Sequence, residues 1–234
     1  MMKSQSLSHR LQAVANFVEQ YANQPIRLAD IGTDHAYLPV NLILNQKISY
    51  AIAGDVAKGP LQSAEQEVLS HQLQDMISVR LGDGLSVVDP KDYMNTVSIC
   101  GMGGKLMTDI LDQGHQYLTP SHTLILQANT GAHIVRNWLS HHSYAIVDET
   151  VIDEDGHLYE IIVAQSQIGS GYSPKEIYLG PCLIQDRCPA WHKKIQSDYH
   201  HLTHVVKAMS QAKNKDAEKI QFYQQALSYI KEYL

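Results

Sequence analysis

The sequence predicts an α/β fold: a parallel sheet that ends in an antiparallel hairpin and is followed by two C-terminal helices. Short apolar runs alternate with helical stretches through the first 130 residues, which is typical of parallel βαβ units and a doubly wound sheet. Two longer strand-like runs then flank Asp155-Gly156, a dipeptide that favours a hairpin turn. Near the C-terminus, apolar residues recur at three- and four-residue steps in two runs, which indicates two amphipathic helices.

The first helix is expected from Leu7 to about Tyr21, with apolar residues from Leu11 to Val18 on one face. The strands of the parallel sheet are expected at Ile26–Ile31, Tyr50–Gly54, Ile77–Leu81, Thr96–Cys100 and Thr123–Ala128. Helices are expected after the second, fourth and fifth strands, at Pro60–His71, Lys105–Gln113 and Ala132–His141. Pro60 suits the first turn of its helix.

The hairpin strands are expected at Ala145–Asp153 and Leu158–Gln165, and Gly169–Pro174 reads as a linker. One late helix is predicted by Trp191, Ile195, Leu202, Val206 and Met209, and the other by Ile220, Tyr223, Leu227 and Ile230. Asn214 lies between them, so we expect an antiparallel helical hairpin with coiled-coil-like packing. The predicted domains are therefore 1–168 and 169–234.

Composition is that of an ordinary globular protein, with 234 residues, 44% of them apolar and 18% charged. No run suits a signal peptide, and none reaches the roughly 18 apolar residues of a membrane span. We therefore expect a cytoplasmic protein with no membrane contact. Cys100, Cys182 and Cys188 form no CxxC pair, so reduced thiols are expected and zinc is not.

The net charge of −6 is unevenly divided along the chain. Residues 175–234 carry nine Lys or Arg against six Asp or Glu, whereas the rest carries nine basic and 18 acidic residues. A weakly basic tail on an acidic body is compatible with a polyanion bound by the tail. A solvated helical face explains the same residues.

Acidic residues end three successive strands. Asp30 and Gly32 close the first, Asp55 follows the second, and Asp83-Gly84 follows the third. Each has an ordinary explanation as a turn residue, or for Asp55 as a helix cap. Together they favour a nucleotide-type cofactor, whose ribose and amine groups donate to carboxylates. The dinucleotide fingerprint G-x-G-x-x-G is absent from the loop after the first strand, which argues against a dehydrogenase.

Two further features lie at strand ends: a loop in which expected glycines are replaced, and a glycine-rich segment. Asp34 and Ala36 stand where a methyltransferase loop usually has further glycines, and His35 lies between them. Cys100-Gly-Met-Gly-Gly104 closes the fourth strand, where the backbone can approach a ligand and Met102 can form an apolar wall, or simply pack in the core.

The fifth strand ends with amides that can hold a base edge or satisfy loop backbone, Gln127 and Asn129. His200, His201 and His204 lack a carboxylate at the spacing of a zinc protease, so they are expected on a solvated face and no metal site is predicted.

With these residues in place, the chain resembles the bacterial TrmK-type tRNA (adenine(22)-N1)-methyltransferases. The resemblance is carried by Ser8–Leu11, Asp30–Pro39, Ala53–Val56, Gly82–Leu85, Ile99–Gly104, Leu126–Asn129, Tyr159–Ile161 and Tyr178–Pro181. It departs from the family pattern at Asp55, where some relatives have Glu, and at Ala128, where Pro is commoner.

The resemblance implies a Rossmann-like class I S-adenosylmethionine-dependent methyltransferase domain with a C-terminal coiled-coil hairpin that binds tRNA. Its substrate would be an adenosine at position 22, in the D-arm. It assigns cofactor binding to Asp30, Gly32, His35, Ala36, Tyr37, Asp55, Val56, Asp83, Gly84, Cys100, Gly101, Met102 and Gly103. Contacts with tRNA are expected at Arg10, Lys193, Lys194 and Lys207, in a monomer or weak homo-oligomer.

Methylation places positive charge on the adenine ring, and a nearby carboxylate can stabilise it. Asp34 is the candidate catalytic residue, because it replaces a glycine in the cofactor loop; Asn129 is a second candidate. The alternatives are a methyltransferase of another RNA or a small molecule, or a non-catalytic RNA-binding protein that keeps the fold.

Overall fold

The computed structural model describes residues 6–167, 171–212 and 215–234. Within them, seven strands form one sheet in the order β3-β2-β1-β4-β5-β7-β6. The strands are β1 Arg27–Ile31, β2 Tyr50–Asp55, β3 Ile77–Leu81, β4 Thr96–Gly103, β5 Thr123–Thr130, β6 Tyr144–Glu154 and β7 His157–Ser166. Strands β1 to β5 are parallel, and β7 and then β6 are added by antiparallel pairing. The predicted arrangement of five parallel strands followed by an antiparallel hairpin is confirmed.

The described helices are α1 His9–Tyr21, α2 Tyr37–Leu44, α3 Lys58–Ser70, α4 Gly104–Gln113, α5 Ala132–His141, α6 Pro174–Leu179, α7 Pro181–Asp186, α8 Pro189–Gln211 and α9 Ala217–Lys231. Three short 3-10 helices are η1 Gly84–Val87, η2 Pro90–Asp92 and η3 His115–Tyr117. The sequence did not predict α2, α6 or α7. Each has eight residues or fewer, too short for a helical period to stand out from noise.

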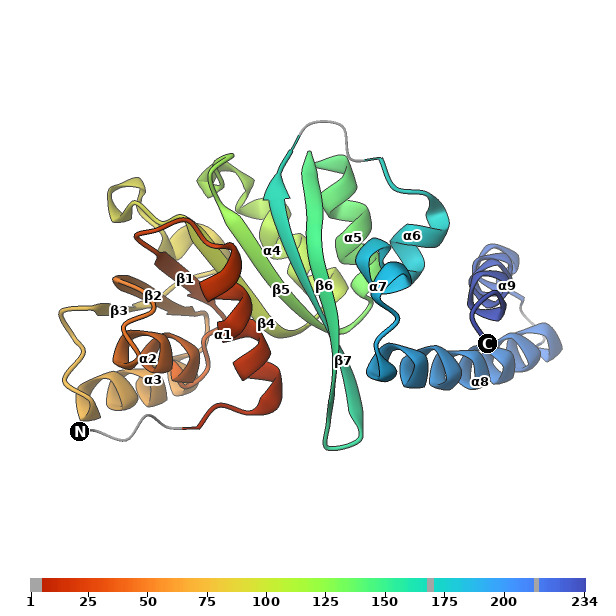
Figure 1. Cartoon of the computed structure of the whole chain (residues 1–234), viewed down its shortest axis with the longest axis horizontal. Coiled ribbons are helices and arrows are strands. Elements are labelled where there is room, and N and C mark those ends of the chain that lie inside the picture. Colours follow the sequence, from red (N-terminus) through yellow and green to blue (C-terminus); the bar gives the residue numbers. More distant parts are fainter. Residues whose placement is uncertain (1–5, 168–170, 213–214) are drawn as a thin grey trace.

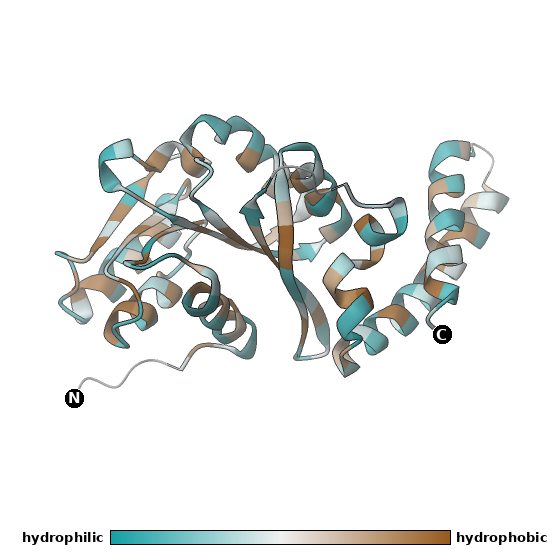
Figure 2. Cartoon of the chain, turned by 45° about the horizontal axis from the view of Figure 1, so that its top comes forward, coloured by the Kyte–Doolittle hydropathy of each residue, from teal (hydrophilic) through white to brown (hydrophobic). Residues whose placement is uncertain are grey.

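Successive side chains of the central strands pack in two different hydrophobic cores, one on each face of the sheet. In β1, Leu28 joins the core beneath α1, α2 and α3, whereas Ala29 joins the core beneath α4 and α5. In β5, Ile125 and Leu126 divide in the same way. This two-residue alternation follows from the pleat, and burial on both faces explains why the central strands read as continuous apolar runs. Hydrophobic stretches accordingly follow the strands in Figure 2.

The hairpin turn between β6 and β7 has the two residues that the sequence indicated. Asp155 has φ 51° and Gly156 has φ 80°, the positive values that a tight two-residue hairpin turn requires.

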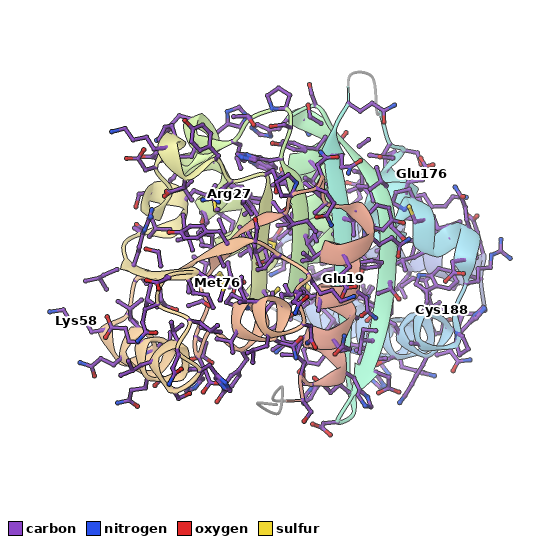
Figure 3. All side chains as sticks on the ribbon, turned by 60° about the vertical axis from the view of Figure 1, so that its left-hand side comes forward. Glu19, Arg27, Lys58, Met76, Glu176 and Cys188 are labelled. Carbon is purple, nitrogen blue, oxygen red and sulfur yellow. The ribbon has the colours of Figure 1, made fainter. Side chains whose placement is uncertain are left out.

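The C-terminal helices lie beyond β6, at the opposite end of the sheet from β3 (Figure 1). Lys58, at the start of α3, and Cys188, just before α8, are at opposite sides of the molecule in Figure 3. A third hydrophobic core joins Trp191 and Ile195 of α8 to Ile230 of α9 and to Val151 of β6. These helices are therefore packed onto the sheet edge.

The predicted helical pair is present, since α8 and α9 pack against each other, but α9 also contacts α6. The coiled-coil character and the boundary at residue 168 stay predictions. Asn214 and the start of the predicted linker, 169–170, lie outside the described residues.

A buried ionic network fastens this end of the molecule together. Arg136 of α5 is fully buried, and its guanidinium pairs with Glu149 of β6 and Glu160 of β7. Glu160 also pairs with Lys194 of α8 at 3.1 Å, and Glu149 accepts a hydrogen bond from the backbone N–H of Cys182 in α7 at 2.9 Å. One cluster of charges thus connects α5, both hairpin strands, α7 and α8.

The pKa of Glu160 reflects this network. Burial alone would raise that pKa, but the charges of Lys194 and Arg136 outweigh burial and lower it to about 2. The folded pKa lies below the ordinary value of 4.5, so the ion pairs stabilise the fold above pH 4.5. That contribution is lost as the pH falls towards 2.

Gly180 makes room for the network at the junction of α6 and α7. A Cβ atom there would lie 2.8 Å from both Nη2 of Arg136 and Oε2 of Glu149, and the residue has φ +91°. A side chain at this position would therefore push into a buried ion pair.

We expect Arg136→Met to lower the free energy of unfolding by about 3–5 kcal/mol, because it leaves two buried carboxylates without their shared partner. Urea denaturation of both proteins measures the difference. Lys47→Met is the control: it breaks the 2.7 Å pair with Glu19, whose side chains are both partly exposed, and should cost about 1 kcal/mol or less. Equal losses in the two variants would contradict a special role for the buried network.

Candidate cofactor-binding and active site

A cavity of about 330 Å³ opens at the carboxyl ends of β1, β2 and β4. It is lined by Arg10, Leu11, Asp30, Gly32, Thr33, Asp34, His35, Tyr37, Leu38, Asp55, Cys100, Gly101 and Met102. The chain order of the sheet reverses between β1 and β4, and open α/β sheets bind ligands at this switch point.

The loop after β1 has positive φ at three alternate positions. The values are 72° at Gly32, 53° at Asp34 and 57° at Ala36. Left-handed backbone suits glycine and costs roughly 1–2 kcal/mol per residue for others, with Asp among the better tolerated. The loop therefore keeps the conformation of a loop with three glycines, although two of them have been replaced.

Asp30 anchors this loop from below. Its buried carboxylate accepts hydrogen bonds from the hydroxyls of Thr33 at 2.7 Å and Ser98 at 2.6 Å, and burial raises its pKa. The backbone N–H groups of Gly32 and Thr33 both donate to the carbonyl of Gly54 in β2, at 2.8 and 3.1 Å. Sequence reasoning missed Thr33 and Ser98. The parallel pairing of β1 with β4, which sets Ser98 opposite Asp30, is the signal that would have found Ser98.

The rim of the cavity carries two aromatic rings and a carboxylate. The rings of His35 and Tyr37 stack with centroids 5.1 Å apart and planes 10° apart. Asp34 lies 3.5 Å from the His35 ring nitrogen, and 70% of its side chain is exposed. Asp34 is thus placed in the cavity but held by few contacts.

Asp55 combines the two roles that the sequence left open. One carboxylate oxygen accepts from the backbone N–H of Ala57 at 2.7 Å, just before α3, and the same side chain lines the cavity. The next residue, Val56, is a 69% exposed apolar side chain beside it.

Some predicted cofactor residues are not part of this lining. Asp83 and Gly84 line a separate cavity of about 170 Å³ against α4. Ala36, Val56 and Gly103 belong to the flanking loops and strand ends without lining the main cavity.

The end of β4 bulges at Gly101, which has φ 78° and interrupts the register with β5. Amide side chains of β5 hold this bulge. Oε1 of Gln127 accepts from the Gly101 N–H at 2.9 Å, Nδ2 of Asn129 donates to the Gly101 carbonyl at 2.7 Å, and the two amides bond each other at 3.0 Å. Both amides therefore satisfy loop backbone. A direct catalytic role for Asn129 stays a prediction, and its contacts support positioning.

Met102 closes the cavity from the β4 side. A Cβ atom at Gly32 would come within 2.2 Å of its terminal methyl group, so Met102 packs directly on the glycine of the loop. Cys100 also lines the cavity, and burial raises the pKa of its thiol.

The four residues expected to contact tRNA have different surroundings in the structure. Arg10 lines the cavity, and Lys194 is paired with Glu160 and Asp198. Lys193 pairs with Asp153, whereas Lys207 is exposed on α8. The environment of Lys194 supports a structural role.

No group of three or more His, Cys, Asp or Glu in the described part of the chain could hold a metal ion. Across the same residues, every helix is too short or too polar to cross a membrane.

The tRNA (adenine(22)-N(1))-methyltransferase family model matches residues 28–232. This chain belongs to that family. It is 38% identical to the tRNA (adenine(22)-N(1))-methyltransferase of Bacillus subtilis (strain 168) over 223 residues, which cover 93% of this chain and 92% of that protein. The family resemblance inferred from the sequence is confirmed.

Solved structures agree over almost the whole chain. The crystal structure of B. subtilis TrmK matches with a TM-score of 0.87 at 36% identity and covers 97% of this chain and 98% of that one. Streptococcus pneumoniae Sp1610 in complex with S-adenosyl-L-methionine matches with a TM-score of 0.85 at 35% identity and coverages of 97% and 99%. M. capricolum TrmK in complex with S-adenosyl-homocysteine matches with a TM-score of 0.82 at 31% identity, covering 98% of each chain. The predicted Rossmann-like fold and the cofactor S-adenosylmethionine are confirmed; the individual binding residues stay predictions.

We expect Asp34→Gly to raise the free energy of unfolding by up to about 1 kcal/mol, because glycine relieves the left-handed backbone strain. The same variant should lose most of its methyl-transfer rate if the carboxylate takes part in the reaction. Thermal or urea unfolding and a turnover assay measure the two effects.

Asp155→Gly is the matched control, since Asp155 is also exposed, with φ 51°, but lies in the hairpin turn. It should show a similar stability change with an unchanged kcat at saturating tRNA. A loss of more than about 1 kcal/mol in Asp34→Gly would contradict strain at this position.

Proposed function

We propose that this protein transfers the methyl group of S-adenosylmethionine to N1 of adenosine 22 in the D-arm of tRNA. The observation that carries the proposal is the acidic cavity at the switch point of a chain that belongs throughout to this family. We place the protein in the cytoplasm, where tRNA is available, as a monomer or weak homo-oligomer.

The residues of the cavity fit S-adenosylmethionine. Its volume of about 330 Å³ lies within the range of small-molecule sites. Asp55 stands where an acidic side chain accepts from ribose hydroxyls in nucleotide-binding folds, and Asp30 fixes the turn beneath the ligand. When bound, the cofactor supplies a methyl group on a positively charged sulfur.

The protein has two tasks in such a transfer. It must draw the target adenine out of the stacked D-arm, and it must align N1 with the methyl group. The cavity opens beside the stacked rings of His35 and Tyr37, which offer an aromatic surface for a flipped base. We assign that surface to the target adenine.

The N1 atom attacks through its ring lone pair, so no proton has to leave before the new bond forms. Positive charge then develops on the adenine ring, and a carboxylate at the mouth of the cavity stabilises it. Asp34 is the exposed carboxylate in the cofactor loop, and we propose that it has this role.

A second cleft of about 520 Å³ runs between the end of β5, the hairpin turn and α8. Asn129, His157 and His201 are among its lining residues. Because Asn129 also bonds to Gly101 of the first cavity, the cleft adjoins the proposed reaction centre. We propose that tRNA reaches the centre along this cleft and along the exposed side of α8.

The product identifies the reaction. An unmodified tRNA transcript incubated with the protein and S-adenosylmethionine should gain N1-methyladenosine at position 22, detected by nuclease digestion and mass spectrometry. A transcript with guanosine at position 22 should gain none. Methylation of other nucleotides would favour another RNA substrate, and tRNA binding without methylation would favour a non-catalytic binder.

Asp34→Asn should lower kcat by roughly 10²- to 10³-fold, because it removes the charge while keeping a residue that tolerates left-handed backbone. Affinity for S-adenosylmethionine, measured by calorimetry, should change little. Asp155→Asn has the same backbone setting outside the cofactor cavity and should keep the wild-type kcat at saturating tRNA, although its turn borders the second cleft. Unchanged turnover in Asp34→Asn would remove Asp34 from the mechanism.

Lys207→Glu should weaken tRNA binding and flatten its salt dependence, because an exposed cation of α8 becomes an anion. Filter binding at several salt concentrations measures both quantities. Lys91→Glu is the charge-matched control, because Lys91 is exposed and lies in η2, between β3 and β4. Deletion of the C-terminal helices is a poorer test, since it would expose Val151 and leave Glu160 without Lys194. Equal effects of the two substitutions would mean that α8 has no special share in tRNA binding.

A further inference from the structure

A cavity of about 320 Å³ lies between α5, α6 and α9, and we call it the inter-helix pocket. Helix α6 packs against both α5 and α9 and lies between them in Figure 1. The residues that line the inter-helix pocket and those that line the cofactor cavity are entirely different. The methyl-transfer site therefore gives no reason for this pocket.

The inter-helix pocket is rich in flat rings. Phe, Trp and Tyr make up 7% of the chain, but half of the twelve lining residues carry an aromatic or imidazole ring. They are His133, His141, Tyr172, Tyr178, Phe222 and Tyr229. The rings of His133 and Tyr178 stack with centroids 5.4 Å apart and planes 29° apart, and the Phe222 centroid lies 5.6 Å and 6.0 Å from theirs. Three helices thus each contribute one ring to a single group.

Phe222 is the ring of this group that stays open to solvent. Its side chain is 44% exposed, although a large apolar ring gains free energy when it is buried. Its contacts with His133 and Tyr178 hold the ring before a ligand binds, so little rotamer freedom is lost when a flat ligand stacks on it. The group is therefore a preformed stacking surface.

The charge and the polar groups of the pocket suit a nucleobase. None of its lining residues is Asp or Glu, in a chain with a net charge of −6, so the phosphate beside a bound base meets no carboxylate of the lining. Asn137 is exposed, and its side-chain amide has no hydrogen-bond partner among the described residues. Amide side chains pair with base edges, whereas an apolar peptide would make no use of this group.

The pocket is continuous with the route proposed above for tRNA. His133 and Tyr178 line both the inter-helix pocket and the second cleft of about 520 Å³. Asn129 of that cleft is in turn bonded to Gly101 of the cofactor cavity. A tRNA that follows the cleft with its target adenine at the reaction centre therefore brings further nucleotides to the pocket.

We infer that the inter-helix pocket binds an unpaired nucleobase of tRNA other than the target adenine, stacked on Phe222 beside His133 and Tyr178. A base that already stands outside the stacked helices fits best, because no unstacking energy is needed. Since α5 packs on the sheet and α9 belongs to the C-terminal helices, the bound base fixes the tRNA relative to both. The inference rests on the proposed function for the identity of the ligand as tRNA.

Phe222→Leu removes the ring but keeps an apolar side chain at this exposed position. It should weaken binding of an unmodified tRNA transcript by about 5- to 50-fold, because the base loses its stacking partner. Both kcat at saturating tRNA and the affinity for S-adenosylmethionine should stay unchanged. Phe222→Tyr keeps the ring and should bind the transcript as the wild type does. Filter binding, turnover and calorimetry measure these quantities.

Tyr93→Leu is the matched control, since Tyr93 is a 76% exposed ring that lines a different cavity. It should leave tRNA affinity unchanged. Unchanged binding in Phe222→Leu, or equal weakening in Phe222→Leu and Tyr93→Leu, would overturn the inference. Loss of binding in Phe222→Tyr as large as in Phe222→Leu would also overturn it, because the ring would then not be what binds.

Transcripts with a single abasic site, placed in turn at each unpaired position other than 22, identify the bound base. One of them should bind the wild type more weakly by the factor seen for Phe222→Leu, and Phe222→Leu should add no further loss with that transcript. Additive losses at every position would contradict a shared contact.

The abasic series also decides the question without any protein variant. If every abasic transcript bound the wild type as tightly as the intact one, the pocket would hold no base of tRNA. The outcome is separate from that of the proposed reaction. Ring-dependent binding without N1-methyladenosine would contradict the proposed reaction alone, whereas methylation with ring-independent binding would contradict the nucleobase pocket alone.

Discussion

Arg136 keeps its charge inside the protein because two carboxylates from different strands surround it, and the position of the C-terminal helices depends on that arrangement. The backbone of α7 reaches the network through Glu149, and α8 reaches it through Lys194. A buried charge without its partners is costly, so these elements cannot separate from the sheet edge without a large loss of stability. The ion pairs and the hydrogen bond also require a defined geometry, because each joins particular atoms of two elements.

The same edge of the sheet carries the geometry of the site. Glu160 pairs across the strands with Ala128 of β5, one residue from both Gln127 and Asn129. Those two amides hold the bulge at Gly101, and Gln127 also holds Arg10. A continuous set of contacts therefore runs from the buried network to the floor of the cavity. Substitutions in the ionic network are therefore expected to change cofactor affinity as well as the stability of the fold.

Sequence patterns predicted the sheet well because strand signals are local. Apolar runs, the Asp155-Gly156 turn and the acidic strand ends each lie within a few residues. The ionic network could not be predicted in this way, because Arg136, Glu149 and Glu160 come from three elements and pair only after the hairpin has folded back. Two of the stretches that carried the family resemblance, Tyr159–Ile161 and Tyr178–Pro181, contain Glu160 and Gly180 and belong to this network. For the site, the acidic strand ends and the family resemblance together predicted most lining residues. Neither could tell that Asp83 faces a separate cavity or that Arg10 enters the main one.

Two residues other than glycine, Asp34 and Ala36, have left-handed backbone in the loop after β1. They differ in whether packing compensates for the strain of that backbone. Ala36 is fully buried and its methyl group packs in the core beneath α1, α2 and α3, so the burial it gains offsets the strain of its backbone. Asp34 has no such compensation, because most of its side chain is exposed and its contact with His35 is long. Strain that persists without a packing gain is concentrated at functional positions. The exposure of Asp34 at the cavity, more than the absence of a glycine, is thus the observation behind the role proposed for this carboxylate.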